Sequence, residues 1–335
     1  MLLLTAPATK ADGRGEPYKF FRAFVGLNQD QIGAIRSGKA LAKVVQSSTP
    51  EEVFVFGAVY VEGNPESYLK LASDIDALRK LPGYVAIRSF SDLPQSSDLD
   101  GFALERQDIE ELKTCEVGHC EVQLPTEAME EFKQSIDWSA PNVDVRVNQV
   151  ARGMALQALL DYMHGGNSAL GVYRDKSHPA AVAETFASLI TRLSALPVYL
   201  PELNDYLLEY PKAKSDNVQA GFYWEEVNFG LKPTFRILQR IVYRATSPEP
   251  VYAVAEKQIY ASHYFEGALD LTVCVKDEQR HGFYIITVKG SKQAGLTGLK
   301  GSIVRKVAVD KARSSLERVL LATKQRLESV HTQGD

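Results

Sequence analysis

The chain has 335 residues, of which 45% are hydrophobic and 24% charged, proportions typical of a globular protein with a substantial core. Acidic residues outnumber basic ones by 42 to 38, and the formal net charge of −4 offers no basic face of the kind that nucleic acid requires. No stretch approaches the roughly 18 consecutive apolar residues of a membrane span, so neither a nucleic-acid partner nor an integral membrane span is expected.

Residues 1–27 combine an apolar start (MLLL), small residues and a polar break. Thr9 and Ala11 fit the −3 and −1 positions of a signal-peptidase site, but the basic region and the apolar core of a full signal are missing or short. Two interpretations stay open. One is a clipped export leader, which predicts a periplasmic or secreted protein, and the other is the disordered tail of a cytoplasmic protein.

The next segment alternates between helix and strand signals. Runs of β-branched and aromatic residues predict strands, and Asn64 followed by Pro65 suits the first turn of a helix. The expected elements are a helix over 28–38, strands over 39–46 and 52–61, a helix over 66–81 and a strand over 84–90.

Two of the three cysteines, Cys115 and Cys120, lie close together in the sequence. Because Gly118 allows a tight turn between them, we predict that they form a disulfide. Free thiols are one alternative, and a metal site that enlists His119 is another, although the pattern lacks the second pair of a zinc site. Cys274 alternates with valines and is expected to be a small buried side chain.

The middle of the chain is nearly all helical. Apolar residues at helical spacing predict helices over 107–112, 125–136, 145–164, 179–196 and 201–210. Strand-rich sequence flanks this region on both sides, so residues 125–215 are interpreted as a helical insertion within a single α+β fold.

The last hundred residues read as a meander that ends in a helix. Strands are expected over 235–244, 251–264, 269–275 and 283–288, and one apolar stripe predicts a helix over 309–327. This order predicts a curved antiparallel sheet wrapped around the terminal helix, with a hollow between them.

A family resemblance follows from these segments. The strand 53–61 that runs into GNPES (63–67), the strand 283–288 that leads through 295–299 into the closing helix, and the Ser262-His263-Tyr264 stretch resemble the START / Bet v 1-like helix-grip superfamily. The whole chain also resembles proteins of environmental bacteria. The resemblance implies a discontinuous helix-grip domain, 28–124 with 216–330, which holds lipids, sterols or other apolar molecules in a cavity.

Five side chains are candidates for that cavity: His263, Tyr223, Glu225, Tyr264 and Tyr284. If 251–264 is a strand, His263 lies on one face while Ser262 and Tyr264 lie on the other, so Ser262 and His263 cannot form a nucleophile–base pair. His263 is either a ligand contact or a satisfied core histidine. Likewise, Glu225 is either a buried acid or base or an edge-strand charge.

Neither a cofactor nor a metal is expected, because the phosphate-binding motifs and ligand spacings are missing. The glycine-rich segment 290–301 is interpreted as a flexible loop or gate. We expect a non-enzymatic protein that binds or transports a small apolar, lipid-like ligand. Two alternatives remain: a cyclase or hydrolase in the same cavity, and an interaction protein that docks a partner through the helices of 145–196.

Overall fold

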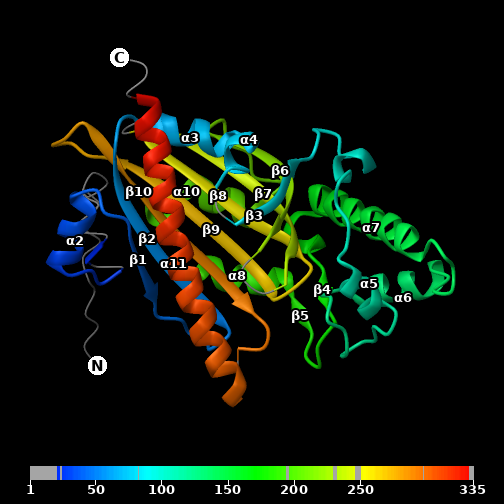
Figure 1. The fold of residues 1–335 in the computed structure, drawn as a ribbon. Coiled ribbons are helices and arrows are strands. Elements are labelled where there is room, and N and C mark those ends of the chain that lie inside the picture. Colours follow the sequence, from blue (N-terminus) through cyan, green and yellow to red (C-terminus); the bar gives the residue numbers. More distant parts are fainter. Residues whose placement is uncertain are drawn as a thin grey trace, which may run out of the picture.

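The computed structural model describes residues 21–22, 25–81, 83–193, 196–228, 232–245, 250–296 and 298–331 (Figure 1). The predicted leader, residues 1–27, therefore lies mostly outside the described residues. Within it, Phe21 is buried, and its ring lies 5.7 Å from that of Phe56 and 6.2 Å from that of Tyr284.

One antiparallel sheet of eight strands organises the protein, in the order β1-β2-β10-β9-β8-β7-β6-β3. The strands are β1 (Leu41–Val45), β2 (Glu52–Glu62), β3 (Tyr84–Ser89), β6 (Val218–Val227), β7 (Thr234–Ala245), β8 (Val251–Ala261), β9 (Phe265–Lys276) and β10 (Gly282–Gln293). Strands from the two ends of the chain pair directly, β2 with β10 and β3 with β6. The predicted α+β class is confirmed, and the sheet stays open between its edge strands, β1 and β3.

Helices cover both faces of this sheet and one of its ends (Figure 1). They are α2 (Gln29–Arg36), α3 (Pro65–Ser73), α4 (Ile75–Leu78), α5 (Arg106–Leu112), α6 (Thr126–Ser135), α7 (Val143–Gly165), α8 (Val182–Arg192), α9 (Leu196–Tyr199), α10 (Pro201–Glu209) and α11 (Gly298–His331), with short 3₁₀ turns η1 (Ser96–Leu99) and η2 (Gly166–Ala169) and a small ribbon of β4 (Val172–Tyr173) and β5 (Ala180–Ala181). Helices α3, α4 and α11 pack on one face, and α2 and α8 to α10 pack on the other. Helices α5 to α7 gather at one end with their own small core.

The helix expected over 66–81 is in fact two helices. Asn64 caps α3 as predicted, since its side chain accepts a hydrogen bond from the backbone of Glu66. The helix ends at Asp74, which has an extended backbone and accepts a hydrogen bond from the backbone N–H of Ala77. Asp74 therefore starts α4, because an aspartate at this position satisfies a free N–H group of a new first turn.

Strand β2 shows how the alternation of side chains builds the two faces. Val55 and Val59 pack in the cluster beneath α11, while Phe56 and Ala58 pack in the cluster beneath α2. Helix α11 approaches the sheet closely at Gly57. The helix is longer than the expected 309–327. Its first turns carry exposed apolar residues such as Ile303, so the buried apolar stripe that predicts the helix does not extend to them.

We expect Gly57→Val to destabilise the fold by about 1–3 kcal/mol through overpacking. A Cβ atom at Gly57 would lie 2.7 Å from methyl carbons of both Leu316 and Leu320. Urea unfolding measures the change in free energy. The control is Gly221→Val, in an exposed part of β6 where a Cβ meets no atom within 4 Å. Equal effects of the two changes would contradict the close approach of α11.

Two expected boundaries near the end of the sheet are wrong. Strand β8 ends at Ala261, so residues 262–264 form a turn instead of extending the strand. The segment 290–301 is mostly not a loop, because β10 runs to Gln293 and α11 begins at Gly298, while Thr297 lies outside the described residues. Gly290 belongs to the strand, and a Cβ there would lie 2.5 Å from the ring of Phe54.

Candidate functional site

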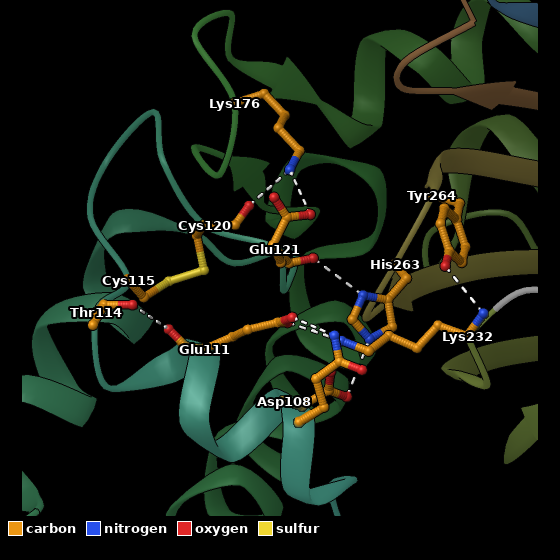
Figure 2. Close-up of polar contacts among 11 residues, drawn as sticks. Asp108, Glu111, Thr114, Cys115, Cys120, Glu121, Lys176, Lys232, His263 and Tyr264 are labelled. Carbon is orange, nitrogen blue, oxygen red and sulfur yellow. Dashed lines mark hydrogen bonds and ion pairs between the residues drawn. A yellow bond between two sulfur atoms is a disulfide. The ribbon is translucent and has the colours of Figure 1, made fainter. Parts of the chain in front are cut away.

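The turn between β8 and β9 lies at the centre of a polar network (Figure 2). Tyr264 turns the chain with a φ of +62°, a left-handed conformation that is uncommon for a bulky residue. The turn is held from two sides, since the carbonyl of Ser262 accepts from the backbone of Gln123 at 2.8 Å and that of Tyr264 accepts from Ala294 at 3.0 Å. It therefore presents His263 and Tyr264 to the neighbouring segments in one defined geometry.

His263 is buried and hydrogen-bonded through both ring nitrogens. Nδ1 lies 3.1 Å from the backbone carbonyl of Glu121, and Nε2 lies 3.1 Å from a carboxylate oxygen of Asp108. Both ring nitrogens therefore have a polar partner within hydrogen-bonding distance. Of the two interpretations left open by the sequence, the satisfied histidine fits this geometry.

Asp108 is the partner that joins this histidine to a lysine. Helix α5 buries Asp108 together with Ile109 and Leu112, and its carboxylate forms an ion pair with Lys232. Burial opposes ionisation of Asp108, but the hydrogen bonds and charges of His263 and Lys232 outweigh it and lower its pKa. The carboxylate is thus held in its charged form by two partners from other segments of the chain.

Lys232 completes the network. Its Nζ also lies 2.8 Å from a carboxylate oxygen of Glu111, and its backbone N–H donates to the hydroxyl of Tyr264 at 3.1 Å. The polar groups of this cluster are therefore engaged with one another, and they tie α5 to the β8–β9 turn (Figure 2).

A short loop closed by Cys115 and Cys120 lies beside the polar network (Figure 2). The two sulfurs lie at disulfide bonding distance and the Cα atoms are 4.6 Å apart, so the predicted pairing is confirmed. Gly118 turns the loop with a φ of +85° and donates to the carbonyl of Arg174 at 2.7 Å, while Cys120 donates to that of Asp175 at 2.9 Å. The loop thereby places the carbonyl of Glu121 against His263.

An open, polar cleft of about 1160 Å³ lies beside this network. Its walls come from the turn before β2, from α5, from residues 121–123 after the disulfide loop, from residues 175–179 and 232–233, from the β8–β9 turn and from the end of β10. Six carboxylates line it: Glu51, Glu105, Glu111, Glu121, Asp175 and Glu266. Within the described part of the chain, no group of three or more histidine, cysteine or acidic side chains is placed to hold a metal ion.

Two smaller cavities lie inside the protein. The space beneath α11, α3 and α4 measures about 100 Å³, and charged side chains form part of its lining: Arg240, Glu256, Asp270 and Lys289. A second cavity of about 120 Å³ lies between α6, α7 and the ends of β7 and β8, and its lining is almost entirely apolar. The apolar cavity therefore belongs to the helical region, while the expected hollow beneath α11 is small and partly charged.

The five predicted site residues lie in three separate places. His263 and Tyr264 both line the polar cleft. Tyr223 and Glu225 are buried on β6, where the Arg240 guanidinium lies 4.3 Å from the ring centre of Tyr223 and Arg236 forms an ion pair with Glu225. Tyr284 packs on the opposite face of the sheet, beside α2, and its hydroxyl donates to Asp277 at 2.9 Å. None of the five lines the space beneath α11.

The sequence alone did not identify Asp108, Glu111, Glu121, Asp175 or Lys232 as site residues. They come from four segments, at 108–111, 121, 175 and 232, so no local spacing connects them all. The one available signal was in the short helix α5, where Asp108 is buried together with the apolar residues Ile109 and Leu112. A charged residue at a buried position indicates a partner, because an unpaired buried charge is costly.

A buried amine, Lys257, lies apart from these spaces. Its Nζ donates to the hydroxyl of Tyr162 at 3.0 Å and lies 4.0 Å from the ring centre of Phe186. Burial lowers the pKa of Lys257 to about 7. It lines neither the cleft nor the two internal cavities, so no substrate space adjoins it there.

Comparisons of the chain with protein-family models, with curated proteins and with solved structures find no match. Of the helices that the structure describes, none combines the length and the apolar character needed to cross a bilayer.

Proposed function

We propose that the protein binds a small apolar molecule, without transforming it, in the cavity between α7 and the sheet. The observation that carries this proposal is the cavity itself, which has a volume of about 120 Å³. The small side chains of alanines on α7 leave this volume unfilled, and phenylalanine rings border it: Ala151, Ala155, Ala158, Phe102, Phe132 and Phe235. An apolar pocket with a few polar groups at its border is the usual form of a small-molecule site.

The size of the cavity limits the ligand. An engineered apolar cavity of about 150 Å³ stays dry and binds benzene, so a similar volume accommodates one six-membered ring or the end of an apolar chain. Helix α7 lies over the cavity, which agrees with a role of the 125–215 insertion as a cover for the ligand.

The position beneath α7 suits an apolar ligand better than the position beneath α11. Beneath α11, the Arg240–Glu256 and Lys289–Asp270 ion pairs form part of the lining, and an apolar ligand there would displace water from charged groups. The long α11 across a large antiparallel sheet supports a further part of the proposal, that the chain belongs to the START / Bet v 1-like helix-grip superfamily.

Binding without reaction is favoured by the polar groups at the cavity border. The hydroxyl of Tyr260 donates to the carbonyl of Gln123 at 2.9 Å, that of Tyr173 accepts from Ala261 at 3.1 Å, and that of Ser262 accepts from Phe235 at 3.1 Å. Burial raises the pKa of the Tyr260 and Tyr173 phenols, so both stay neutral. These groups hold the backbone of the site in place.

We expect Ala155→Leu to weaken benzene binding at least tenfold, because the larger side chain fills the space that the ligand occupies. Ala155 is buried on the inner side of α7, and a leucine there replaces ligand volume with protein volume. Binding is measured by the benzene-dependent rise in melting temperature and by NMR titration of the wild type and the variant.

The matched control is Gln157→Leu, which adds the same side chain to the exposed side of the same helix and should leave benzene binding unchanged. The proposal fails if the wild type does not bind benzene, or if Ala155→Leu binds it equally well. Tighter binding of dodecanoate than of benzene would extend the ligand class to lipid-like chains.

A further inference from the structure

We propose that Lys257 of β8 is the centre of a pH-sensitive lock between the sheet and the helices α7 to α10, closed while its amine is neutral and weakened when the amine takes up a proton. The lock consists of Lys257, Gln239 of β7, Tyr162 of α7 and Asn167 of η2. It lies on the face of the sheet opposite α11, where α8 and α10 pack (Figure 1). The lock does not require a ligand in the apolar cavity.

Lys257 is fully buried, with 0% of its surface exposed. Two aromatic rings cover the amine, since Nζ lies 4.0 Å from the ring centre of Phe186 and 4.8 Å from that of Tyr162. Lysine is almost never fully buried without a charged partner, because an ammonium loses its hydration on burial. Aromatic rings attract an ammonium, but they replace only part of that hydration. The amine therefore needs a counter-charge or has to be neutral.

The hydrogen-bond partners of Lys257 are neutral. Its Nζ donates to the hydroxyl of Tyr162 at 3.0 Å and to the side-chain oxygen of Asn167. The Tyr162 hydroxyl in turn donates to Oε1 of Gln239 at 2.7 Å. A neutral amine has two N–H groups, and these two acceptors use both, whereas an ammonium brings a third N–H and a positive charge. The cluster is thus complete for the neutral amine.

The titratable groups that pack on the cluster are phenols. Tyr210 stacks on Tyr162 with ring centres 5.2 Å apart, and Tyr206 lies beside Tyr210 at 5.6 Å. Burial raises the pKa of all three phenols, so they are neutral. Among the described residues Lys257 forms no ion pair, and burial alone lowers its pKa to about 7.

The charged side chains of the surrounding elements lie elsewhere. Those of the last two turns of α7, of α8 and of α10 are exposed: Asp161, His164, Glu184, Arg192, Glu202, Asp205 and Glu209. Those next to Lys257 on the neighbouring strands line the space beneath α11, on the other face of the sheet: Arg240, Glu256 and Asp270. The residue opposite Lys257 on β9 is Leu269. A proton on Lys257 therefore introduces a charge that no described neighbour compensates.

The same cluster joins two parts of the protein. Lys257 belongs to the sheet, whereas Asn167 belongs to η2, directly after α7. The side-chain nitrogen of Asn167 donates to the carbonyls of Leu207 at 3.1 Å and Leu208 at 2.7 Å, at the end of α10. A charge on Lys257 therefore acts at the point where η2 and α10 meet the sheet.

The direction of the pH effect follows from the two environments of the amine. Where the helices separate from the sheet, water solvates Lys257 and its pKa returns toward the ordinary 10.5. The open state therefore takes up a proton first as the pH falls below about 10.5, and the closed state is progressively disfavoured. Below about pH 7 both states hold the proton and the effect levels off. The lock is therefore firmest in alkaline solution and has lost most of this contribution at pH 7.

Hydrogen exchange of the full-length protein tests the lock, with each rate corrected for the intrinsic effect of pH. In the wild type, we expect the opening constant of residues 162–169 and 201–209 to rise at least tenfold between pH 9 and pH 7, and less than twofold between pH 6 and pH 5. In Lys257→Met, which keeps an unbranched side chain without an amine, the rise between pH 9 and pH 7 should be less than twofold.

The matched control is Lys276→Met, which removes an exposed lysine of β9 and should behave like the wild type. A second variant, Asn167→Asp, places a carboxylate beside the amine. The carboxylate holds the proton on Lys257 in the closed state as well, so the rise between pH 9 and pH 7 should be at least threefold smaller than in the wild type. This variant provides the test if Lys257→Met does not fold.

Three outcomes would overturn the proposal. They are no rise in the opening constant of the wild type between pH 9 and pH 7, an equal rise in Lys257→Met, and an equal rise in the amides of β2 and β10. The last would show that Lys257 lowers the stability of the whole protein and does not control the docking of these helices.

Discussion

Asp108→Asn should lower the free energy of unfolding by about 3–5 kcal/mol at pH 7, the range seen when one partner of a buried ion pair is removed. The wild-type carboxylate forms an ion pair with Lys232 and accepts a hydrogen bond from His263, and Asp108 is only 3% exposed. A neutral amide removes the negative charge beside His263 and leaves Lys232 with Glu111 as its remaining acidic partner. Urea unfolding of the two proteins gives the difference.

The pH dependence of this difference follows from the lowered pKa of Asp108. A carboxyl whose pKa is lower in the folded state stabilises the protein above its unfolded pKa of about 3.9, and this contribution is lost as the pH falls further. The asparagine variant has no such contribution, so the two stabilities should converge in acid. Asp92→Asn, an exposed acid with no ion pair among the described residues, is the control and should change little. A gap that persists unchanged down to pH 2 would exclude ionised Asp108 as its source.

Glu256→Gln should cost about 3 kcal/mol at pH 7, because one pKa unit corresponds to about 1.4 kcal/mol. Burial opposes ionisation of Glu256, but the charges of Arg240 and Lys289 and the hydrogen bond from Arg240 outweigh it and lower its pKa to about 2 from an ordinary 4.5. The Arg240 guanidinium also donates to the carbonyl of Ala72 at 2.7 Å. The pair therefore fixes α3 to the sheet.

This contribution is present above about pH 4.5 and lost as the pH falls toward 2. The stabilities of Glu256→Gln and wild type should therefore meet near pH 2. The double variant Arg240→Met with Glu256→Leu should recover much of the loss, since apolar residues often replace a buried ion pair without cost. If the free energy of unfolding of Glu256→Gln lies within about 0.5 kcal/mol of the wild-type value at pH 7, the Arg240–Glu256 ion pair contributes about as little as an exposed ion pair.

The elements with strong local signals were predicted well. The β-branched run of β2 was expected over 52–61 and is found at Glu52–Glu62, and the helix expected over 145–164 is found at Val143–Gly165. The disulfide was also predictable, because Gly118 and the short spacing of Cys115 and Cys120 suffice to close the loop. These features depend on contacts between near neighbours in the chain.

His263 shows where local patterns mislead. Its neighbours continue the alternation of β8, so the sequence predicts a strand through residue 264. The chain instead turns at Tyr264, since Gln123 and Ala294 take up backbone hydrogen bonds of the turn. Those two residues are distant in sequence, and no local pattern announces them.

The sequence by itself determined the class of the fold and most element boundaries and favoured the pairing of Cys115 with Cys120, because periodicity, capping and turn preferences are short-range properties. Only the tertiary structure decided that the apolar cavity lies beneath α7, that charges line the space beneath α11, and that Asp108, Lys232 and His263 meet. Each of these depends on side chains from segments more than a hundred residues apart. Such side chains come into contact only when the chain packs into its tertiary structure.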